Sequence, residues 1–222
     1  MRFRVLASDY DGTLACEGKV AAGTIAALKR MRASGRKLIL VTGRELPELR
    51  DLFSSMDLFD LVVVENGALL HFPATGENRL LGAKADKSFI RQMAHHGVPV
   101  SVGRSVVATI RPYDKLVLKI IQEFSFPLQV TYNKEAVMVL PVGVSKATGL
   151  AAALAELSLD ESDVVGIGDA ENDHAFLSRC GLSVAVANAI PSLKQRVDQV
   201  TRGEDGSGVV EIIDQILKTD IP

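Results

Sequence analysis

The sequence predicts an α/β fold built on a doubly wound, parallel, Rossmann-like sheet into which an α+β segment is inserted. At both ends of the chain, short apolar runs alternate with longer amphipathic segments, a pattern typical of parallel strands covered by helices on both faces. Between about residues 68 and 142 the rhythm changes to strands at hairpin spacing. We therefore expect a core formed by residues 1–67 and 143–222, and a cap-like insert over residues 68–142.

The N-terminal part predicts three strands joined by two helices. The run Lys37–Val41 is continuously apolar after its first residue, as in strands buried on both faces of a parallel sheet. Gly35 supplies a stop for the first helix, and Pro47 is tolerated in the first turn of the second. The expected elements are a strand over Phe3–Ser8, a helix over Thr24–Ser34, a strand over Lys37–Val41, a helix over Glu45–Met56 and a strand over Leu61–Val64.

The middle of the chain predicts antiparallel strands and two helices. Turn-forming residues separate its short apolar runs, and Gly97 ends the first of its amphipathic segments. The expected elements are a hairpin of Ala68–Phe72 with Arg79–Leu81, a helix over Asp86–His96, one or two strands within Val98–Ile110, a helix over Tyr113–Phe124, and a hairpin of Leu128–Tyr132 with Ala136–Leu140.

The C-terminal part returns to the first rhythm. Pro191 opens one of its helices, and a glycine-rich stretch precedes the last. The expected elements are a helix over Lys146–Leu157, a strand over Asp163–Ile167, a helix over Asn172–Arg179, a strand over Leu182–Val186, a helix over Ile190–Arg196 and a helix over Val209–Lys218.

Composition excludes several classes of protein. The 222 residues include 25 Lys and Arg against 27 Asp and Glu, so the chain lacks the basic excess of a dedicated binder of nucleic acid or membrane surfaces. Two cysteines make no disulfide framework. No apolar run has the length of a secretory signal or a membrane span. We expect a cytoplasmic protein, monomeric or homodimeric, without a nucleic-acid or membrane partner.

Two carboxylates leave the end of the first predicted strand together, at Asp9 and Asp11. Open α/β sheets bind ligands at the carboxyl ends of their strands. Like charges this close are costly unless a cation joins them, and carboxylate oxygens suit Mg²⁺. The alternative is an acidic strand-to-loop turn, because Asp-Gly is common in turns.

The second strand ends in Thr42-Gly43-Arg44, where a hydroxyl and backbone N–H groups ahead of a helix suit a phosphate. Considered by themselves, these three residues are better explained by an ordinary helix cap. Lys146 opens the helix after the insert, against the helix dipole. That position suits neutralisation of a phosphate, although without the other motifs a solvated lysine is the better explanation.

A third strand end is rich in acids, with Asp169, Glu171, Asn172 and Asp173 in five residues. Such a cluster resembles a metal site. Acids in the first turn of a helix would explain one carboxylate by itself. They explain less well the pair Asp169 and Asp173, which bracket the turn.

Taken together and in this order, these motifs resemble the haloacid dehalogenase-like hydrolase superfamily, in the branch with a large cap between the second and third motifs (subfamily IIB, Cof-type). The four motifs are DYDGT, TGR, Lys146 within VSKATGL, and GDAENDHAFL. The Asn66-Gly67 turn is also similar to that branch. In length and insert size the chain looks closest to members resembling phosphoglycolate and sugar phosphatases.

The resemblance implies a Mg²⁺-dependent phosphatase of small phosphorylated metabolites that works through an aspartyl-phosphate. Asp9 would be the nucleophile and Asp11 the general acid and base. Lys146 would neutralise the phosphoryl group. The ligands of the phosphate would be Thr42, Gly43, Lys146 and Asn172, with Arg44 as a further contact. The ligands of Mg²⁺ would be Asp9, the carbonyl of Asp11, Asp169 and Asp173.

Two other functions stay open on the same core: a phosphotransferase or phosphomutase, and a regulatory module that serves a partner domain. A dinucleotide-binding protein is disfavoured, because no G-x-G-x-x-G follows the first strand. In the insert, Arg104, Arg111 and Lys134 are candidates for an anionic tail of the substrate, weighed against solvated surface. Metal binding by His95 and His96 is disfavoured.

Overall fold

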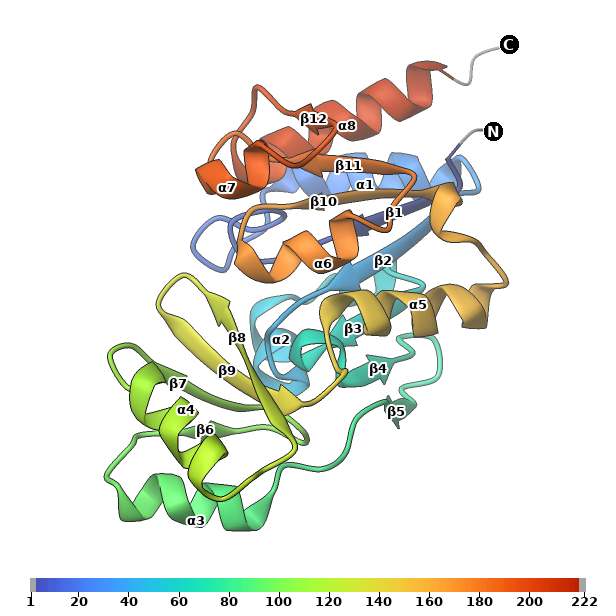
Figure 1. Ribbon diagram of the computed structural model, residues 1–222. Coiled ribbons are helices and arrows are strands. Elements are labelled where there is room, and N and C mark those ends of the chain that lie inside the picture. The colour runs from blue at the N-terminus through green and yellow to red at the C-terminus, as the bar shows by residue number, and fades with distance from the viewer. Residues whose placement is uncertain (1–2, 220–222) are drawn as a thin grey trace.

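A sheet of eight strands runs through the centre of the structure, a computed structural model that describes residues 3–219 (Figure 1). Its order is β12-β11-β10-β1-β2-β3-β4-β5, and all pairs from β12 to β3 are parallel. The parallel strands are β1 (Val5–Ser8), β2 (Lys37–Val41), β3 (Leu61–Val64), β10 (Val164–Gly168), β11 (Leu182–Ala185) and β12 (Gln199–Val200). The predicted α/β fold class is confirmed.

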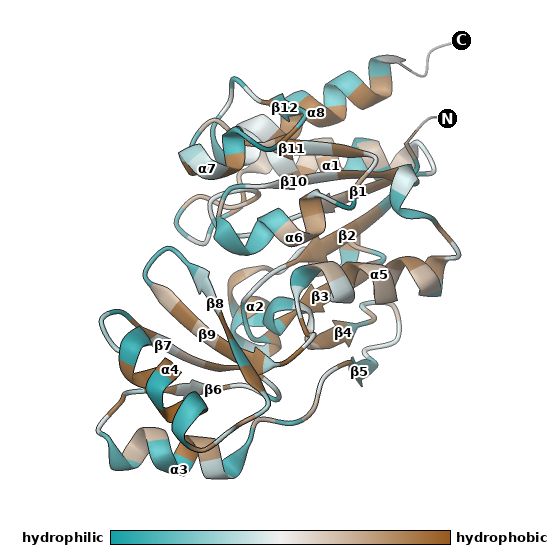
Figure 2. Cartoon of the chain, viewed as in Figure 1, coloured by the Kyte–Doolittle hydropathy of each residue, from teal (hydrophilic) through white to brown (hydrophobic). Residues whose placement is uncertain are grey.

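Helices cover both faces of this sheet. On one face α1 (Ala22–Ala33) packs against α8 (Asp205–Thr219), and on the other α5 (Lys146–Leu157) packs against α6 (His174–Leu177). The central strands are apolar and buried (Figure 2) because both of their faces meet helices. Two shorter helices, α2 (Leu46–Leu52) and α7 (Pro191–Lys194), follow β2 and β11. Within residues 3–219, none of the helices has the length and apolar composition that crossing a membrane requires.

The connections reverse direction beside β1. From β1 the chain proceeds outward through β2 to β3, and after the insert it starts again at β10, on the other side of β1, and proceeds to β11 and β12. Loops diverge at such a switch point and leave a crevice outside the carboxyl ends of the strands. The residues that follow β1 and β10 therefore lie side by side at the rim of this crevice.

The hairpin of β4 (Leu69–His71) and β5 (Asn78–Leu80) extends the central sheet, whereas the sequence pattern placed it in the insert. Strand β4 pairs antiparallel with β3. Hairpin spacing predicts that two strands pair with each other, but it carries no information about which other strand edge they join. We propose that the inserted unit begins after β5.

A second sheet forms the insert, with four antiparallel strands in the order β6-β7-β9-β8. Helices α3 (Lys87–His95) and α4 (Asp114–Glu123) cover one face, where Phe89 and Val117 are fully buried. The opposite face carries Met138 and turns toward the central sheet, packing against Ala68. The strands are β6 (Ser101–Val102), β7 (Val107–Ile110), β8 (Leu128–Asn133) and β9 (Ala136–Pro141).

Several predicted bounds differ from the structure. The helix expected over Glu45–Met56 ends at Leu52, and a separate 3₁₀ turn, η1, spans Met56–Leu58. The helix expected from Asn172 begins as a 3₁₀ turn, η4 (Glu171–Asp173), before α6. Two further 3₁₀ turns are η2 (Glu65–Gly67) and η3 (Glu161–Asp163), and the short strand β12 was not predicted.

The last helix starts at Asp205, four residues before the expected Val209, because its glycines serve close packing. A Cβ added at Gly206 would lie 2.4 Å from the Thr24 hydroxyl oxygen on α1. A Cβ at Gly208 would lie 2.5 Å from that of Thr201. The predicted glycine-rich turn is therefore only partly confirmed: residues 202–204 precede the helix, and residues 205–208 form the first turn of the helix that rests on α1.

One carboxylate joins the insert to the core. Glu65, directly after β3, is buried and accepts hydrogen bonds from the backbone N–H groups of Arg104 (3.0 Å), Ser105 (2.8 Å) and Val106 (3.1 Å). These groups belong to the turn between β6 and β7. A carboxylate that collects three N–H donors in a dry environment makes strong, charge-assisted bonds. Glu65 thus fixes the β6–β7 turn against the end of β3.

Replacing Glu65 by glutamine is expected to lower the free energy of unfolding by about 1.5–3 kcal/mol, the range for hydrogen bonds to charged groups. Glutamine keeps the shape but loses the charge, and its NH₂ group would face backbone donors. Urea denaturation measures the change. Glu77→Gln, at an exposed position, is the control and should stay within about 0.5 kcal/mol of the wild type. Equal stability of both variants would contradict the role of Glu65.

Candidate active site

Asp9 stands at the centre of the rim, directly after β1. Its side chain is buried, and Oδ1 accepts a hydrogen bond from Lys146 Nζ at 2.5 Å. The other oxygen, Oδ2, is buried without a hydrogen-bond partner in the part of the chain that the structure describes. Burial raises the pKa of Asp9 well above its ordinary value, the charges of Asp173 and Asp169 raise it further, and Lys146 opposes them. An unpaired buried oxygen of this kind is suited to a cation or to a reacting atom.

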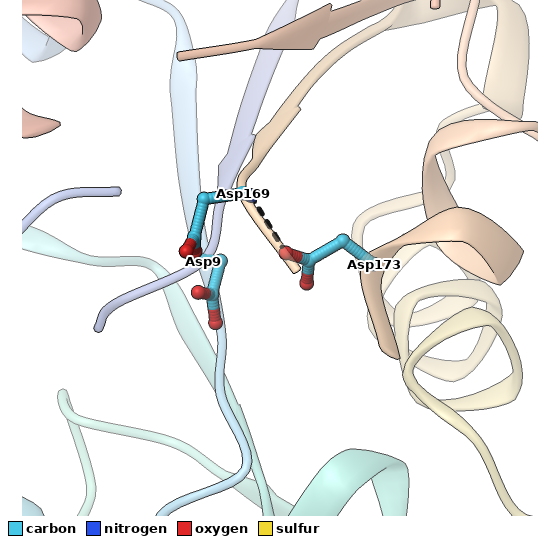
Figure 3. Close-up of side chains that lie close together, drawn as sticks. All are labelled: Asp9, Asp169 and Asp173. Carbon is cyan, nitrogen blue, oxygen red and sulfur yellow. Dashed lines mark hydrogen bonds between the residues drawn. The ribbon is translucent and has the colours of Figure 1, made fainter. Parts of the chain in front are cut away.

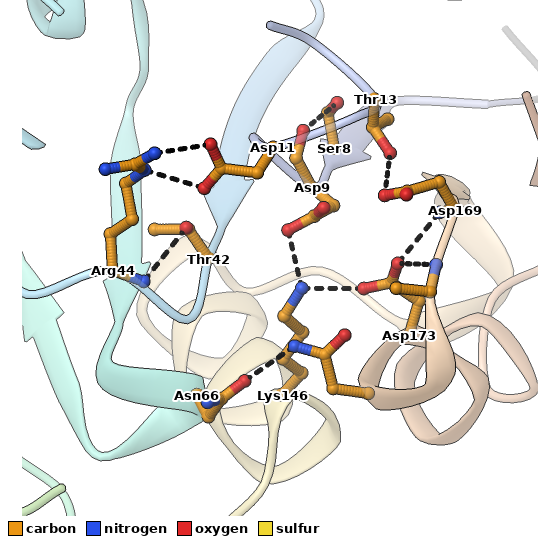
Figure 4. A network of polar contacts seen from close by, with 12 residues as sticks. Ser8, Asp9, Asp11, Thr13, Thr42, Arg44, Asn66, Lys146, Asp169 and Asp173 are labelled. Atoms are coloured by element: carbon orange, nitrogen blue, oxygen red, sulfur yellow. Dashed lines mark hydrogen bonds and ion pairs between the residues drawn. The ribbon is translucent and has the colours of Figure 1, made fainter. Parts of the chain in front are cut away.

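Lys146 is the cation of the site and lies between two carboxylates. The first residue of α5, it is fully enclosed and donates to Asp9 Oδ1 and to Asp173 Oδ1, the latter at 2.6 Å (Figure 4). Burial lowers the pKa of Lys146, but the two carboxylates outweigh burial and raise it above the ordinary value. The ammonium is therefore charged, and its two partners explain how a lysine is accommodated at a buried helix N-terminus.

Close backbone contact positions this lysine. A Cβ added at Gly67 would lie 1.9 Å from the carbonyl oxygen of Ser145, the residue that caps α5. Only glycine allows the turn after β3 to approach the start of α5 so closely, and its φ of +101° also favours glycine. The Asn66-Gly67 turn thus sets where Lys146 begins its helix.

Three carboxylates could hold a metal ion, those of Asp9, Asp169 and Asp173 (Figure 3). One oxygen of each lies within 4.8 Å of the others, and all three side chains are buried. Burial raises the pKa of Asp169, and the charge of Asp173 adds to it, against the hydrogen bond from Lys134. Hard carboxylate oxygens such as these fit a Mg²⁺ ion.

Hydrogen bonds orient the carboxylates that follow β10. Asp173 Oδ2 accepts from the backbone N–H groups of Asp169 (2.8 Å) and Ala170 (2.9 Å), which ties the η4 turn back to the strand end. Asp169 Oδ1 accepts from the Thr13 hydroxyl at 3.0 Å. Asp173 therefore supports Asp169 and Lys146, while Asp169 faces the crevice from β10.

Asp11 lies apart from this cluster, on the side of the second strand. Its carboxylate makes a two-pronged ion pair with Arg44, with Nε–Oδ2 at 2.6 Å and Nη2–Oδ1 at 2.7 Å (Figure 4). Arg44 also donates to Glu48, and its guanidinium lies over the ring of Tyr10. Arg44 thus holds the Asp11 carboxylate in place, and its contact with substrate stays a prediction.

The remaining predicted phosphate ligands come from two different strand ends, those of β2 and β10. Thr42 is buried after β2, and its hydroxyl accepts from the Arg44 N–H at 3.2 Å. Gly43 follows it. Asn172 in η4 donates to Asn66 Oδ1 at 2.9 Å, and its own Oδ1 is buried without a partner among the described residues. Thr42 lies on the side of Lys146 away from Asp169 (Figure 4).

The site also contains residues that the sequence pattern did not assign to it. Thr13 contacts Asp169, and Asn66 contacts both Asn172 and, from the insert, Met138, with Nδ2 2.6 Å from the sulfur. Asn66 lies two residues after the end of β3, at the same sheet edge as the predicted ligands, and this position in the sequence was the signal that could have identified it. Lys134, weighed only as a tail contact, donates to Asp169 Oδ2 at 2.8 Å.

Other weighed residues lie elsewhere. His95 and His96 end α3 with their rings in edge-to-face contact. Arg111 places its guanidinium over the ring of Tyr132, and the side chain of Arg104 is exposed. Cys180 is partly buried, and burial raises the pKa of its thiol to about 12.

Comparisons with known proteins agree on one family. A sequence model of haloacid dehalogenase-like hydrolases matches residues 6–102 and 108–213. The chain is 33% identical to phosphoglycolate phosphatase 2 of Saccharolobus solfataricus, over 96% of this chain and 92% of the relative.

Solved structures share the fold. A haloacid dehalogenase-like hydrolase from Bacteroides thetaiotaomicron has a TM-score of 0.80 at 18% identity, covering 96% of this chain and 99% of that one. A sugar phosphatase of subclass IIB also has a TM-score of 0.80, at 19% identity, covering 96% of this chain and 98% of that one. The chain therefore belongs to the haloacid dehalogenase-like hydrolase family and is a phosphatase, that is, a phosphoric monoester hydrolase.

Proposed function

We propose that this phosphatase hydrolyses small phosphorylated metabolites with Mg²⁺ as cofactor and through an aspartyl-phosphate on Asp9. One observation carries the proposal: Asp9 Oδ2 is buried and unpaired among the described residues, while Oδ1 is held by Lys146. A carboxylate with one oxygen fixed and the other left open is oriented for attack on phosphorus. The predicted alternative of a regulatory module does not account for this open oxygen.

The first half of the reaction transfers the phosphoryl group to Asp9. An oxygen of Asp9 attacks phosphorus, the ester bond between phosphorus and the leaving oxygen breaks, and Asp11 donates a proton to that oxygen. Lys146 and the Thr42 hydroxyl stabilise the charge on the transferring group, together with the Gly43 N–H and Asn172. The ion pair with Arg44 occupies both Asp11 oxygens, so Asp11 separates from Arg44 and takes up a proton before it serves as the acid.

The second half of the reaction hydrolyses the aspartyl-phosphate and regenerates the free enzyme. Asp11 accepts a proton from water, the water oxygen attacks phosphorus, and the bond between phosphorus and Asp9 breaks, which releases inorganic phosphate. The residues that would hold Mg²⁺ are Asp9 and Asp169, with Asp173 in support. The family resemblance adds the Asp11 carbonyl as a further ligand. When bound, this ion would neutralise carboxylate and phosphoryl charge and so permit the attack of one anion on another.

Removal of metal is expected to abolish activity. With EDTA, phosphate release from phosphoglycolate, sugar phosphates or 4-nitrophenyl phosphate should fall to background, and excess Mg²⁺ should restore it, because three buried carboxylates otherwise repel the dianionic phosphoryl group. Phosphate release is measured beside substrate loss. Release that resists EDTA would contradict the metal assignment. Substrate loss without equal release of phosphate would favour the phosphotransferase alternative.

Among substrates, we propose phosphoglycolate ahead of sugar phosphates. The support is the name of the relative that is 33% identical over nearly the whole chain, a phosphoglycolate phosphatase, whereas the sugar phosphatase shares only the fold at 19% identity. Comparison of kcat/KM for phosphoglycolate and hexose phosphates tests the order. A higher kcat/KM for a hexose phosphate would reverse it.

A further inference from the structure

A hairpin tip of the insert enters the active site. Strands β8 and β9 are joined at Lys134 and Glu135, and Lys134 has a φ of +53°, so the chain turns sharply there. The backbone N–H of Lys134 donates to Glu171 Oε2 at 3.1 Å, and its ammonium donates to Asp169 Oδ2 at 2.8 Å. The tip is thus held over η4 from two points, and it delivers a cation to a carboxylate that follows β10.

The two ends of this ion pair have different environments. The Asp169 side chain is fully enclosed, whereas that of Lys134 is 52% exposed. An ammonium has three N–H donors, and the bond to Asp169 uses one. Lys134 therefore stands at the mouth of the site with capacity for a second anionic partner.

When a divalent ion is bound, the three carboxylates of the site are neutralised without the charge of Lys134. Asp9, Asp169 and Asp173 carry three negative charges, and Lys146 together with a divalent cation carries three positive charges. These three carboxylates are then neutralised without Lys134, whose backbone N–H, and not its ammonium, contacts the further carboxylate of Glu171. Asp169 would be a ligand of that ion. The Lys134 ammonium would then exchange Asp169 for another anion.

The direction of attack determines which part of the substrate meets Lys134. In phosphoryl transfer the attacking and leaving oxygens lie roughly in line with phosphorus between them. Asp9 attacks from the rim of the central sheet, so the leaving group points away from that sheet, toward the insert. There it finds Lys134 from the β8–β9 tip and Met138 from β9, whose sulfur lies against Asn66. An apolar side chain close above the rim limits the leaving group to a short one.

We propose that Lys134 is a specificity-determining residue that binds a carboxylate on the leaving group, so that the enzyme selects phosphate esters of short hydroxy acids over those of neutral alcohols. This inference rests on the proposed function and assigns a residue to the recognition of its substrate. Two hydrogen bonds anchor the hairpin that carries Lys134. Its ammonium is a cation from the insert that contacts the cluster of buried carboxylates.

The test compares phosphoglycolate with ethyl phosphate, which has the same chain length without the carboxylate. The ratio of their kcat/KM values is measured for the wild type, Lys134→Met, Lys134→Arg and Lys119→Met. In Lys134→Met the ratio should fall on the order of 100-fold, mainly through the KM for phosphoglycolate, because a charge-assisted contact is lost. Arginine should restore most of the preference. Lys119 is exposed on α4 and is the matched control, which should keep the wild-type ratio.

A second measurement does not depend on turnover. Titration calorimetry with MgCl₂ in the absence of substrate should show tighter binding by Lys134→Met than by the wild type, because the ammonium competes for Asp169 Oδ2. Equal Mg²⁺ affinity would overturn the exchange of partners. An unchanged ratio in Lys134→Met, or a wild type without preference for phosphoglycolate, would overturn the specificity role and leave the phosphatase proposal standing. A wild type that releases phosphate from neither ester, nor from sugar or aryl phosphates, would overturn both.

Discussion

Replacing Asp9 by asparagine is expected to reduce phosphate release by at least about 10⁴-fold, as in other enzymes that lose their nucleophile. The amide is nearly isosteric but a poor nucleophile, and it no longer offers an anionic oxygen to a cation. The residual rate is measured in stopped assays at a high enzyme concentration, so that the phosphate released exceeds the detection limit. The variant should remain folded, because Lys146 keeps its bond to Asp173.

The matched control for this change is Asp51→Asn, which removes an exposed carboxylate on α2. It should retain the wild-type rate. Circular dichroism and thermal unfolding of both variants show whether a loss of activity reflects loss of structure. A purified Asp9→Asn protein with a rate near that of the wild type would exclude Asp9 as the nucleophile.

The central sheet could be predicted because its signals are local. Continuous apolar runs such as Lys37–Val41 mark strands buried on both faces, and helical spacing between them fixes the order of elements. The pairing of β4 with β3 could not be predicted in this way. Nor could the start of α8, because the reason for Gly206 lies in a contact with Thr24, far away in the sequence.

The candidate site also has features that could be predicted from local sequence signals and features that could not. Asp9, Asp169 and Asp173 could be placed together in advance, because the carboxyl ends of adjacent parallel strands share one sheet edge. The contacts between side chains within the site could not be predicted from the sequence. The ion pair of Asp11 with Arg44 depends on side-chain direction, and the contact between Lys134 and Asp169 depends on how the insert packs on the core.

Lys146→Ala is expected to lower kcat on the order of 10²-fold or more, because it removes a preorganised charge from the phosphoryl group. The structure adds an effect on stability. Without the ammonium, the buried carboxylates of Asp9 and Asp173 lose their shared partner, and breaking a buried ion pair in this way costs about 3–5 kcal/mol. Urea denaturation in metal-free buffer at pH 7.5 measures this loss.

The pH dependence of that loss identifies its cause. The pKa of Asp9 is already raised by burial and by Asp173, and removal of Lys146 takes away the charge that opposes this rise. A carboxyl group whose pKa is higher in the folded than in the unfolded state contributes stability while it is protonated and loses that contribution as the pH rises through the folded pKa. Lys146→Ala should therefore recover stability, relative to the wild type, as the pH falls from 7.5 toward 5.

Added Mg²⁺ should recover part of the same loss at pH 7.5, because a divalent cation replaces the missing charge between the carboxylates. Lys29→Ala removes an exposed lysine from α1 and should show neither the loss nor the recovery. If Lys146→Ala were as stable as the wild type at pH 7.5, Lys146 would not be what permits Asp9 and Asp173 to be buried as anions. A loss of stability that neither acid nor Mg²⁺ reverses would assign it to the cavity left by the side chain.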